Sequence, residues 1–236
     1  SATPLPSDTS PKYDKVLRGP TRDHWLQLGD IEMDKLINTK TMIFIPFSDV
    51  PTSQRVGDCN PVTRIKPNKD RVRFTISGSQ LDYPYATATN NASIPDFKLL
   101  LNHVVSSPQR KLMTIDIKDF YLNTPLDTPE YMRIHIRHIS PRSMSLYALA
   151  NLVHGKHVYT KPLKGIYGLP QAGRLAQELL QARLEAANYE TCSTNRGIYR
   201  HQSYSVKFTI TVDDFGVAYD NPEDFKHLID TRQRHY

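Results

Sequence analysis

Cysteine and long apolar runs are scarce in this chain, and each shortage argues against a class of protein. Cys59 and Cys192 are the only cysteines among 236 residues, so no disulfide framework is expected. No apolar run approaches the roughly 18 residues of a membrane span, and no signal peptide is recognised, so neither membrane insertion nor secretion is expected. Nine histidines are present, but no Cys-x-x-Cys accompanies them, which argues against zinc.

Positive charge is in excess. Lys and Arg number 30 against 24 Asp and Glu, a formal net charge of +6. This balance favours polyanionic partners such as nucleic acids, although many basic proteins bind none.

Two adjacent acids lie between two alternating apolar runs. Apolar residues occupy every second position of Val206–Val212 and of Phe215–Tyr219, with Asp213 and Asp214 between them. This alternation predicts a β-hairpin with the acids at its bend. No Asn-Gly or Asp-Gly forms the turn, although Asp tolerates a left-handed backbone better than most residues. An isolated Asp-Asp pair is more often a solvated turn than a catalytic site.

A third acid follows an apolar run about a hundred residues earlier. Asp116 closes Lys111–Ile115, which is predicted to be a core strand. One interpretation is a strand-end Asp that caps the next turn. The other is a metal ligand, because phosphoryl transfer by two divalent ions needs several hard anionic oxygens, and acids on neighbouring strands can supply them.

The remaining patterns predict alternating helices and strands in an α+β fold. Residues 1 to about 20 are rich in Pro, Ser, Thr and Asp and show no apolar period, so a disordered tail or linker is expected there. The apolar periods predict helices over Trp25–Ile37, Pro95–Ser106 and about 171–188, with Asn188 as a left-handed stop, and a strand over Met42–Phe47.

A basic segment lies between these elements. Arg71-Val72-Arg73-Phe74-Thr75 alternates as a strand, so both arginines should project from one side while Val72 and Phe74 pack on the other. The usual interpretation of such a segment is a solvated face. The segment's basic residues are Arg64, Lys66, Lys69, Arg71 and Arg73.

Three motifs in order carry a family resemblance. They are IDIKDFYLN from Ile115, KGIYGLPQAG from Lys164 and VDDF from Val212. The chain resembles, from about Trp25 to its C-terminus, the reverse transcriptases of copia-type LTR retrotransposons, which are RNA-directed DNA polymerases. Each motif alone is weak, and their order and spacing make the resemblance specific.

The resemblance implies roles for individual residues. Asp116 and Asp213 would bind two catalytic Mg²⁺ ions, for which Mn²⁺ is a substitute, and Asp214 would be the less directly bound acid. Tyr121 would lie under the ribose and exclude a 2′-hydroxyl, and Gln171 would lie beneath the incoming nucleotide. Taken without the resemblance, Tyr121 is a core aromatic and Gln171 an exposed first-turn residue.

The basic segment takes a role from the same resemblance. Arg71 and Arg73 would belong to the fingers and contact the triphosphate, with Arg73 as the principal contact and Lys66 or Lys69 as electrostatic support. Arginine suits this role because its planar fork binds phosphate oxygens in pairs.

The implied fold is a right-hand polymerase truncated before the thumb, with an antiparallel palm sheet and a fingers subdomain. The implied partners are an RNA or DNA template with its primer, deoxynucleoside triphosphates, and the remainder of a Pol polyprotein with thumb, RNase H and integrase. The expected location is intracellular, in a cytoplasmic virus-like particle or the nucleus. The expected ranges are a tail at 1–22 and the polymerase at 23–236, with fingers at about 41–92 and 128–163 and palm at about 93–127 and 164–236.

One departure leaves alternatives open. Thr211 stands where many relatives carry a Tyr that helps to place the primer end. The alternatives are a truncated, inactive retroelement remnant and a nucleic-acid-binding fold that needs neither magnesium nor Asp116.

Overall fold

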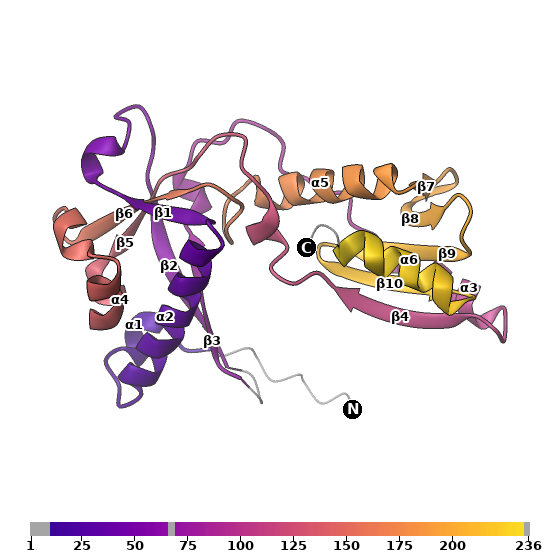
Figure 1. The fold of residues 1–236 in the computed structure, drawn as a ribbon, viewed down its shortest axis with the longest axis horizontal. Coiled ribbons are helices and arrows are strands. Elements are labelled where there is room, and N and C mark those ends of the chain that lie inside the picture. Colours follow the sequence, from indigo (N-terminus) through magenta and orange to yellow (C-terminus); the bar gives the residue numbers. More distant parts are fainter. Residues whose placement is uncertain (1–9, 66–68, 234–236) are drawn as a thin grey trace. The chain divides into compact units, whose positions relative to one another are not determined.

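The computed structural model describes residues 10–65 and 69–233, and within them the chain is an α+β fold (Figure 1). These residues form two five-stranded sheets, one mixed and one antiparallel, and six α-helices. The chain divides into two compact units, one of residues 1–85 and 125–172 and the other of 86–124 and 173–236. Among the described residues, every helix is too short or too polar to cross a bilayer.

The first unit contains the mixed sheet, in which β2 (Gly57–Arg64) and β5 (Met132–His135) pair in parallel and the other neighbours are antiparallel. Its buried side chains include Phe74, Ile134 and Val158, each essentially inaccessible to solvent. The strand order is β1 (Met42–Ile45), β6 (His157–Pro162), β5 (Met132–His135), β2 (Gly57–Arg64) and β3 (Arg71–Ile76).

Three α-helices belong to the first unit. They are α1 (Tyr13–Val16), α2 (Arg22–Asn38) and α4 (Pro141–Leu146). The described part of the expected tail is folded, because Tyr13 is buried and its hydroxyl donates to the carbonyl of Trp25 at 3.3 Å. Residues 1–9 of that tail lie outside the described residues.

The second unit contains the antiparallel sheet, and its strands follow one another closely in sequence except for β4. The order is β4 (Lys111–Asp116), β10 (Asp214–Tyr219), β9 (Val206–Thr211), β8 (Asn195–His201) and β7 (Tyr189–Cys192). β4 therefore joins the edge of a meander that the chain forms about a hundred residues later. The acidic hairpin predicted from the alternation is β9–β10.

Helices cover both faces of this second sheet. On one face, Leu180 of α5 (Ala172–Ala186) and Leu228 of α6 (Pro222–Gln233) share a core with Phe208 and Phe215. Figure 1 shows α6 lying over the sheet. On the other face, α3 (Ile94–Val105) packs the Phe97 ring against Gly216, where a Cβ would stand 2.6 Å from the ring and force it to shift.

Local signals set the ends of these helices. A capping box begins α3, since Ser93 and Asp96 bond each other's backbone N–H. Beyond the end of α5, Asn188 has a φ of 62°, which confirms the left-handed stop predicted there. The predicted strand over Met42–Phe47 ends early, at Ile45. Pro46 has no N–H to donate to a ladder, and a 3-10 turn follows at Phe47–Asp49.

Candidate metal centre

The end of β4 faces the start of β10. In their register, Asp116 lies directly opposite Asp214 and Ile115 directly opposite Phe215. Ile115 and Phe215 pack in the core beneath α5 and α6. Because side chains alternate along a strand, Asp116 and Asp214 share the opposite face, where both are exposed.

The connection between β9 and β10 is a two-residue turn. Thr211 pairs with Asp214, so Val212 and Asp213 form the loop. Val212 has a φ of 60°, whereas Asp213 is not in the left-handed region, so the left-handed residue is a valine rather than an aspartate. A positive φ at the first loop residue alone is typical of a type II′ turn, where glycine is preferred. A β-branched residue in this conformation costs on the order of 1–3 kcal/mol.

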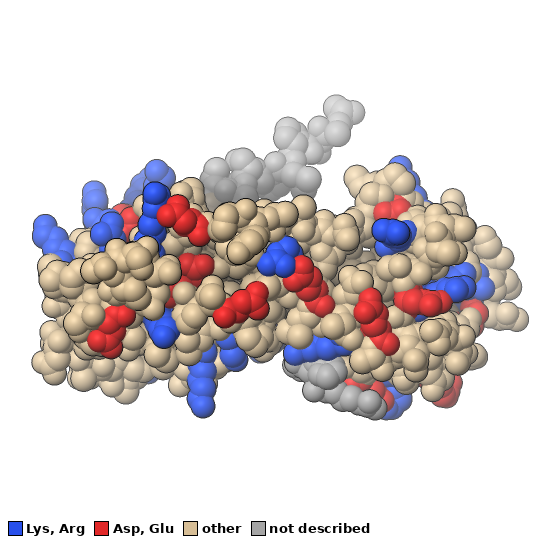
Figure 2. Space-filling model, turned by 90° about the horizontal axis from the view of Figure 1, so that it is seen from above, with Lys and Arg blue, Asp and Glu red and all other residues tan. Residues whose placement is uncertain are grey.

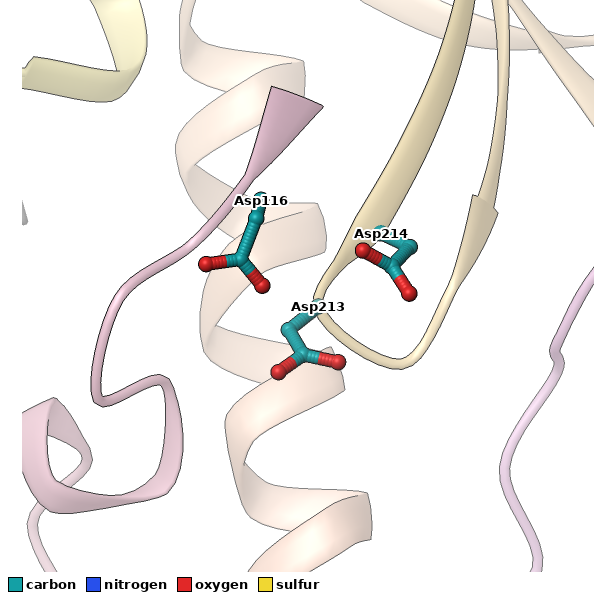
Figure 3. Close-up of side chains that lie close together, drawn as sticks. All are labelled: Asp116, Asp213 and Asp214. Atoms are coloured by element: carbon teal, nitrogen blue, oxygen red, sulfur yellow. The ribbon is translucent and has the colours of Figure 1, made fainter. Parts of the chain in front are cut away.

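The turn brings the three acids together. Asp116, Asp213 and Asp214 each offer one carboxylate oxygen, and these oxygens all lie within 4.8 Å of one another. In Figure 3 the carboxylate of Asp116, from the end of β4, approaches the two from the hairpin. The sequence analysis selected these three acids, and the fold places them in one cluster.

The chemistry of this cluster suits a hard divalent cation. Like charges at such separations repel each other, so a bound cation would offset a standing electrostatic cost. Carboxylate oxygens are the ligands that Mg²⁺ prefers, and an acidic cluster of this width can serve two ions about 3.5–4 Å apart. The three residues present therefore fit the magnesium pair that the sequence analysis expected.

No family model and no curated protein matches this chain.

Two hydrogen bonds fix the backbone around the acids. The Ile117 N–H donates to the carbonyl of Asp213 at 2.9 Å, just beyond the last residue pair of β4 and β10. The Arg232 guanidinium, from the last turn of α6, donates to the carbonyl of Asp116 at 2.7 Å. Both ends of the cluster are thereby tied to the sheet and to the helix above it.

Tyr121 lies close to this cluster, in a 3-10 turn at Tyr121–Asn123. Its ring is half-buried, and burial followed by the negative charge of Asp213 raises the pKa of its hydroxyl. A pocket of about 180 Å³ opens beside it, lined also by Asn91, Gln177 and Val212. Tyr121 is thus partly accessible from a pocket next to the acids, rather than a fully enclosed core aromatic.

A segment without a sequence motif forms one wall of this pocket. The side chain of Gln177, on α5, binds both the N–H and the carbonyl of Asn90, at 2.7 and 2.6 Å. The next residue, Asn91, accepts a hydrogen bond from the Val212 N–H at 2.9 Å. Neither Asn91 nor Gln177 belongs to a sequence motif, so neither was predicted from the sequence.

The basic strand belongs to the first unit. In β3, Val72 and Phe74 are buried while Arg71 is exposed and Arg73 partly so, which confirms the predicted alternation. The guanidinium of Arg73 lies 4.4 Å from the ring centre of Tyr167. Lys66, expected as electrostatic support for the triphosphate, lies outside the described residues.

Two arginines of this unit oppose each other across the ladder. Arg64 of β2 is the register partner of Arg71, and both are exposed. Like charges directly opposite each other destabilise a strand pair.

Gln171 is buried, although its sequence position in a first helical turn indicated an exposed residue. It is 3% exposed, and its amide nitrogen donates to Glu130 at 2.6 Å. Burial raises the pKa of Glu130, although the bond from Gln171 acts in the opposite direction. The expected place of Gln171 beneath a nucleotide stays a prediction.

Proposed function

We propose that this chain is the fingers and palm of an RNA-directed DNA polymerase of the copia-type retrotransposon kind. The observation that carries the proposal is the convergence of Asp116, Asp213 and Asp214 from the end of β4 and the β9–β10 turn. These acids come from two of the three ordered motifs that resemble that family. The second unit would be the palm, and the first unit would be the fingers.

The acids would act as ligands rather than as nucleophiles. When bound, two Mg²⁺ ions activate a primer 3′-hydroxyl and neutralise charge on the triphosphate and the leaving pyrophosphate. Asp116 and Asp213 would hold these ions, and Asp214 would add negative charge at the edge of the site. The exposure of Asp116 and Asp214 leaves them accessible to metal and substrate.

Two further residues would select and bind the nucleotide. Tyr121, half-buried beside the 180 Å³ pocket, would contact the sugar of a nucleotide bound at the metal ions. Arg73, stacked on Tyr167, presents a planar donor fork that suits triphosphate oxygens.

Primer extension tests this proposal. The chain is incubated with oligo(dT) on poly(rA), dTTP and Mg²⁺, and product length is followed. Asp116→Asn is expected to abolish extension while leaving binding of the primed template intact. Asp127→Asn, an exposed acid of the first unit, makes the same charge change outside the cluster and should extend as the parent does. Extension by Asp116→Asn at the parent's rate contradicts the assignment.

A nucleic-acid-binding fold without catalysis is the second candidate, and the net charge of +6 favours it. Figure 2, however, shows Lys and Arg interspersed with Asp and Glu on the face drawn, rather than gathered in one patch. This candidate predicts salt-sensitive binding that is indifferent to Mg²⁺ and to Asp116, with no extension. A binding titration with and without the metal separates the two.

A further inference from the structure

Val212 adopts a backbone conformation that its own side chain disfavours. Its φ of 60° lies in the left-handed region, and it is the residue directly before Asp213. β-branched residues rarely take this conformation unless their surroundings impose it. The question is which contact imposes it.

The side chain of Asn91 supplies such a contact. Its amide oxygen accepts a hydrogen bond from the Val212 N–H at 2.9 Å, between residues 121 positions apart. The amide nitrogen of Asn91 donates to the hydroxyl of Thr89 at 2.9 Å, which orients the amide group with its oxygen toward the turn. The contact thus comes from an oriented side chain on a different segment.

The segment that carries Asn91 is itself anchored on both sides. Gln177 of α5 binds both backbone groups of Asn90, and the Ala92 N–H donates to the carbonyl of Ile210 in β9 at 2.8 Å. Asn91 therefore stands between a helix and the strand that leads into the turn. A side chain held in this way can resist relaxation of the turn.

We propose that Asn91 is a positioning residue for the metal centre, acting through Val212 on the carboxylate of Asp213. If Val212 relaxed to a negative φ, the peptide that follows would rotate, and Asp213 would turn away from Asp116. The hydrogen bond from Ile117 holds the carbonyl group of Asp213, and the bond to Asn91 holds the N–H of the preceding residue, Val212. This inference rests on the proposed metal-dependent function.

Asn91→Leu and Val212→Gly test the inference in a double-mutant cycle. Leucine has a similar size and no acceptor, and glycine takes a positive φ at little cost. Asn91→Leu is expected to speed hydrogen exchange of the Val212 amide and to weaken Mn²⁺ binding about tenfold, the usual cost of losing a residue that orients a ligand. In the Val212→Gly background, the same substitution should weaken Mn²⁺ binding by less than about threefold, because the contact then has little strain to oppose.

Asn91→Asp is the matched control, because it keeps the acceptor oxygen. It should keep exchange at Val212 as slow as in the parent, and exchange clearly faster than in the parent overturns the inference. This control remains decisive where Asn91→Leu fails to fold. An equal loss of Mn²⁺ affinity from Asn91→Leu in both backgrounds, or no loss in either, also overturns the inference.

The failure of the proposed function has a separate signature. If the parent chain binds no Mn²⁺, the metal centre is absent, and the positioning role falls with it. If the parent binds Mn²⁺ and Asn91→Leu matches it in affinity and in Val212 exchange, only the positioning role is overturned.

Discussion

The backbone N–H of Ile117 donates a 2.9 Å hydrogen bond to the carbonyl of Asp213, joining residues that are far apart in sequence. Ile117 is 1% exposed and belongs to the core beneath α5 and α6. The position of the hairpin tip is therefore set by a buried residue rather than by the exposed acids. The three carboxylates repel one another, which disfavours the close approach of β4 to the hairpin tip. The packing of Ile117 in the core stabilises that approach.

The left-handed Val212 predicts an unusual response to substitution. Val212→Gly should leave the chain about 1 kcal/mol more stable than Val212→Ala, because alanine keeps the Cβ that disfavours a positive φ. Both variants lose the same packing of the valine methyl groups, so their difference isolates the backbone term. Denaturant unfolding of the two variants measures it. Equal stabilities, or a more stable alanine variant, contradict a strained turn.

Much of this region was predictable because its signals are local. Alternation predicted a hairpin with Asp213 and Asp214 at its bend, since side chains on one face recur at every second residue. The observed loop is Val212 and Asp213, one residue earlier, because Asp214 already pairs with Thr211. The left-handed stop at Asn188 also followed from residue type. The φ at Val212 was not predictable, because residue type favours Asp or glycine there. The Val212 N–H donates a hydrogen bond to Asn91, a contact between distant parts of the sequence that residue type cannot indicate.

Tyr121 should determine the choice of sugar. Tyr121→Ala is expected to raise the ratio of ribonucleotide to deoxynucleotide incorporation by about an order of magnitude or more, since it removes the ring that would collide with a 2′-hydroxyl. Tyr121→Phe keeps the ring and should keep the parent's ratio. Single-nucleotide incorporation from paired rUTP and dTTP reactions gives both values. An unchanged ratio in Tyr121→Ala removes Tyr121 from sugar selection.

Arg73 should contribute mainly to triphosphate binding. Arg73→Ala is expected to raise the KM for the nucleotide about tenfold with a smaller effect on kcat, because charge-assisted hydrogen bonds to phosphate are lost. Arg73→Lys keeps the charge and loses the paired donors, so its KM should lie between those of the parent and of Arg73→Ala. Steady-state extension over a range of dTTP concentrations separates KM from kcat. A fall in kcat alone would place Arg73 elsewhere in the mechanism.

Three histidines predict a pH dependence in the first unit. The ring of His135 lies 6.0 Å from that of His138 and 5.1 Å from that of His157, between ring centres. Burial lowers the pKa of each, and nearby Arg137 lowers it further; the bond from His138 to Asp14 acts in the opposite direction without reversing the shift. The three imidazoles therefore bind a proton more tightly in the unfolded chain than in the folded chain.

It follows that stability falls as the pH drops below the ordinary histidine value of 6.5 toward the lower folded values. Denaturant midpoints at about pH 7.5 and about pH 5.5 measure the effect in a range where most other side chains do not titrate. A variant with His135→Gln and His157→Gln should show a smaller change. Equal or greater stability of the parent at the acidic pH contradicts the prediction.

The parts of the site that sequence could not indicate all depend on long-range contacts. Asn91 reaches Val212 across 121 positions, Gln177 reaches Asn90 across 87, and Arg232 reaches Asp116 across 116. Asn91, Gln177 and Arg232 belong to no motif and to no apolar period. Gln171 illustrates the converse, since it lies within a motif, yet its burial against Glu130 depends on tertiary packing.

The central claim is that Asp116, Asp213 and Asp214 together bind divalent metal. Titration of Mn²⁺ into the chain, followed by electron paramagnetic resonance, tests it most directly. We expect the parent to bind Mn²⁺ in competition with Mg²⁺. Asp116→Asn and Asp213→Asn should each weaken binding about tenfold or more, whereas Asp127→Asn should not. A parent that binds no Mn²⁺, or an Asp116→Asn variant that binds it as tightly as the parent, would contradict the claim.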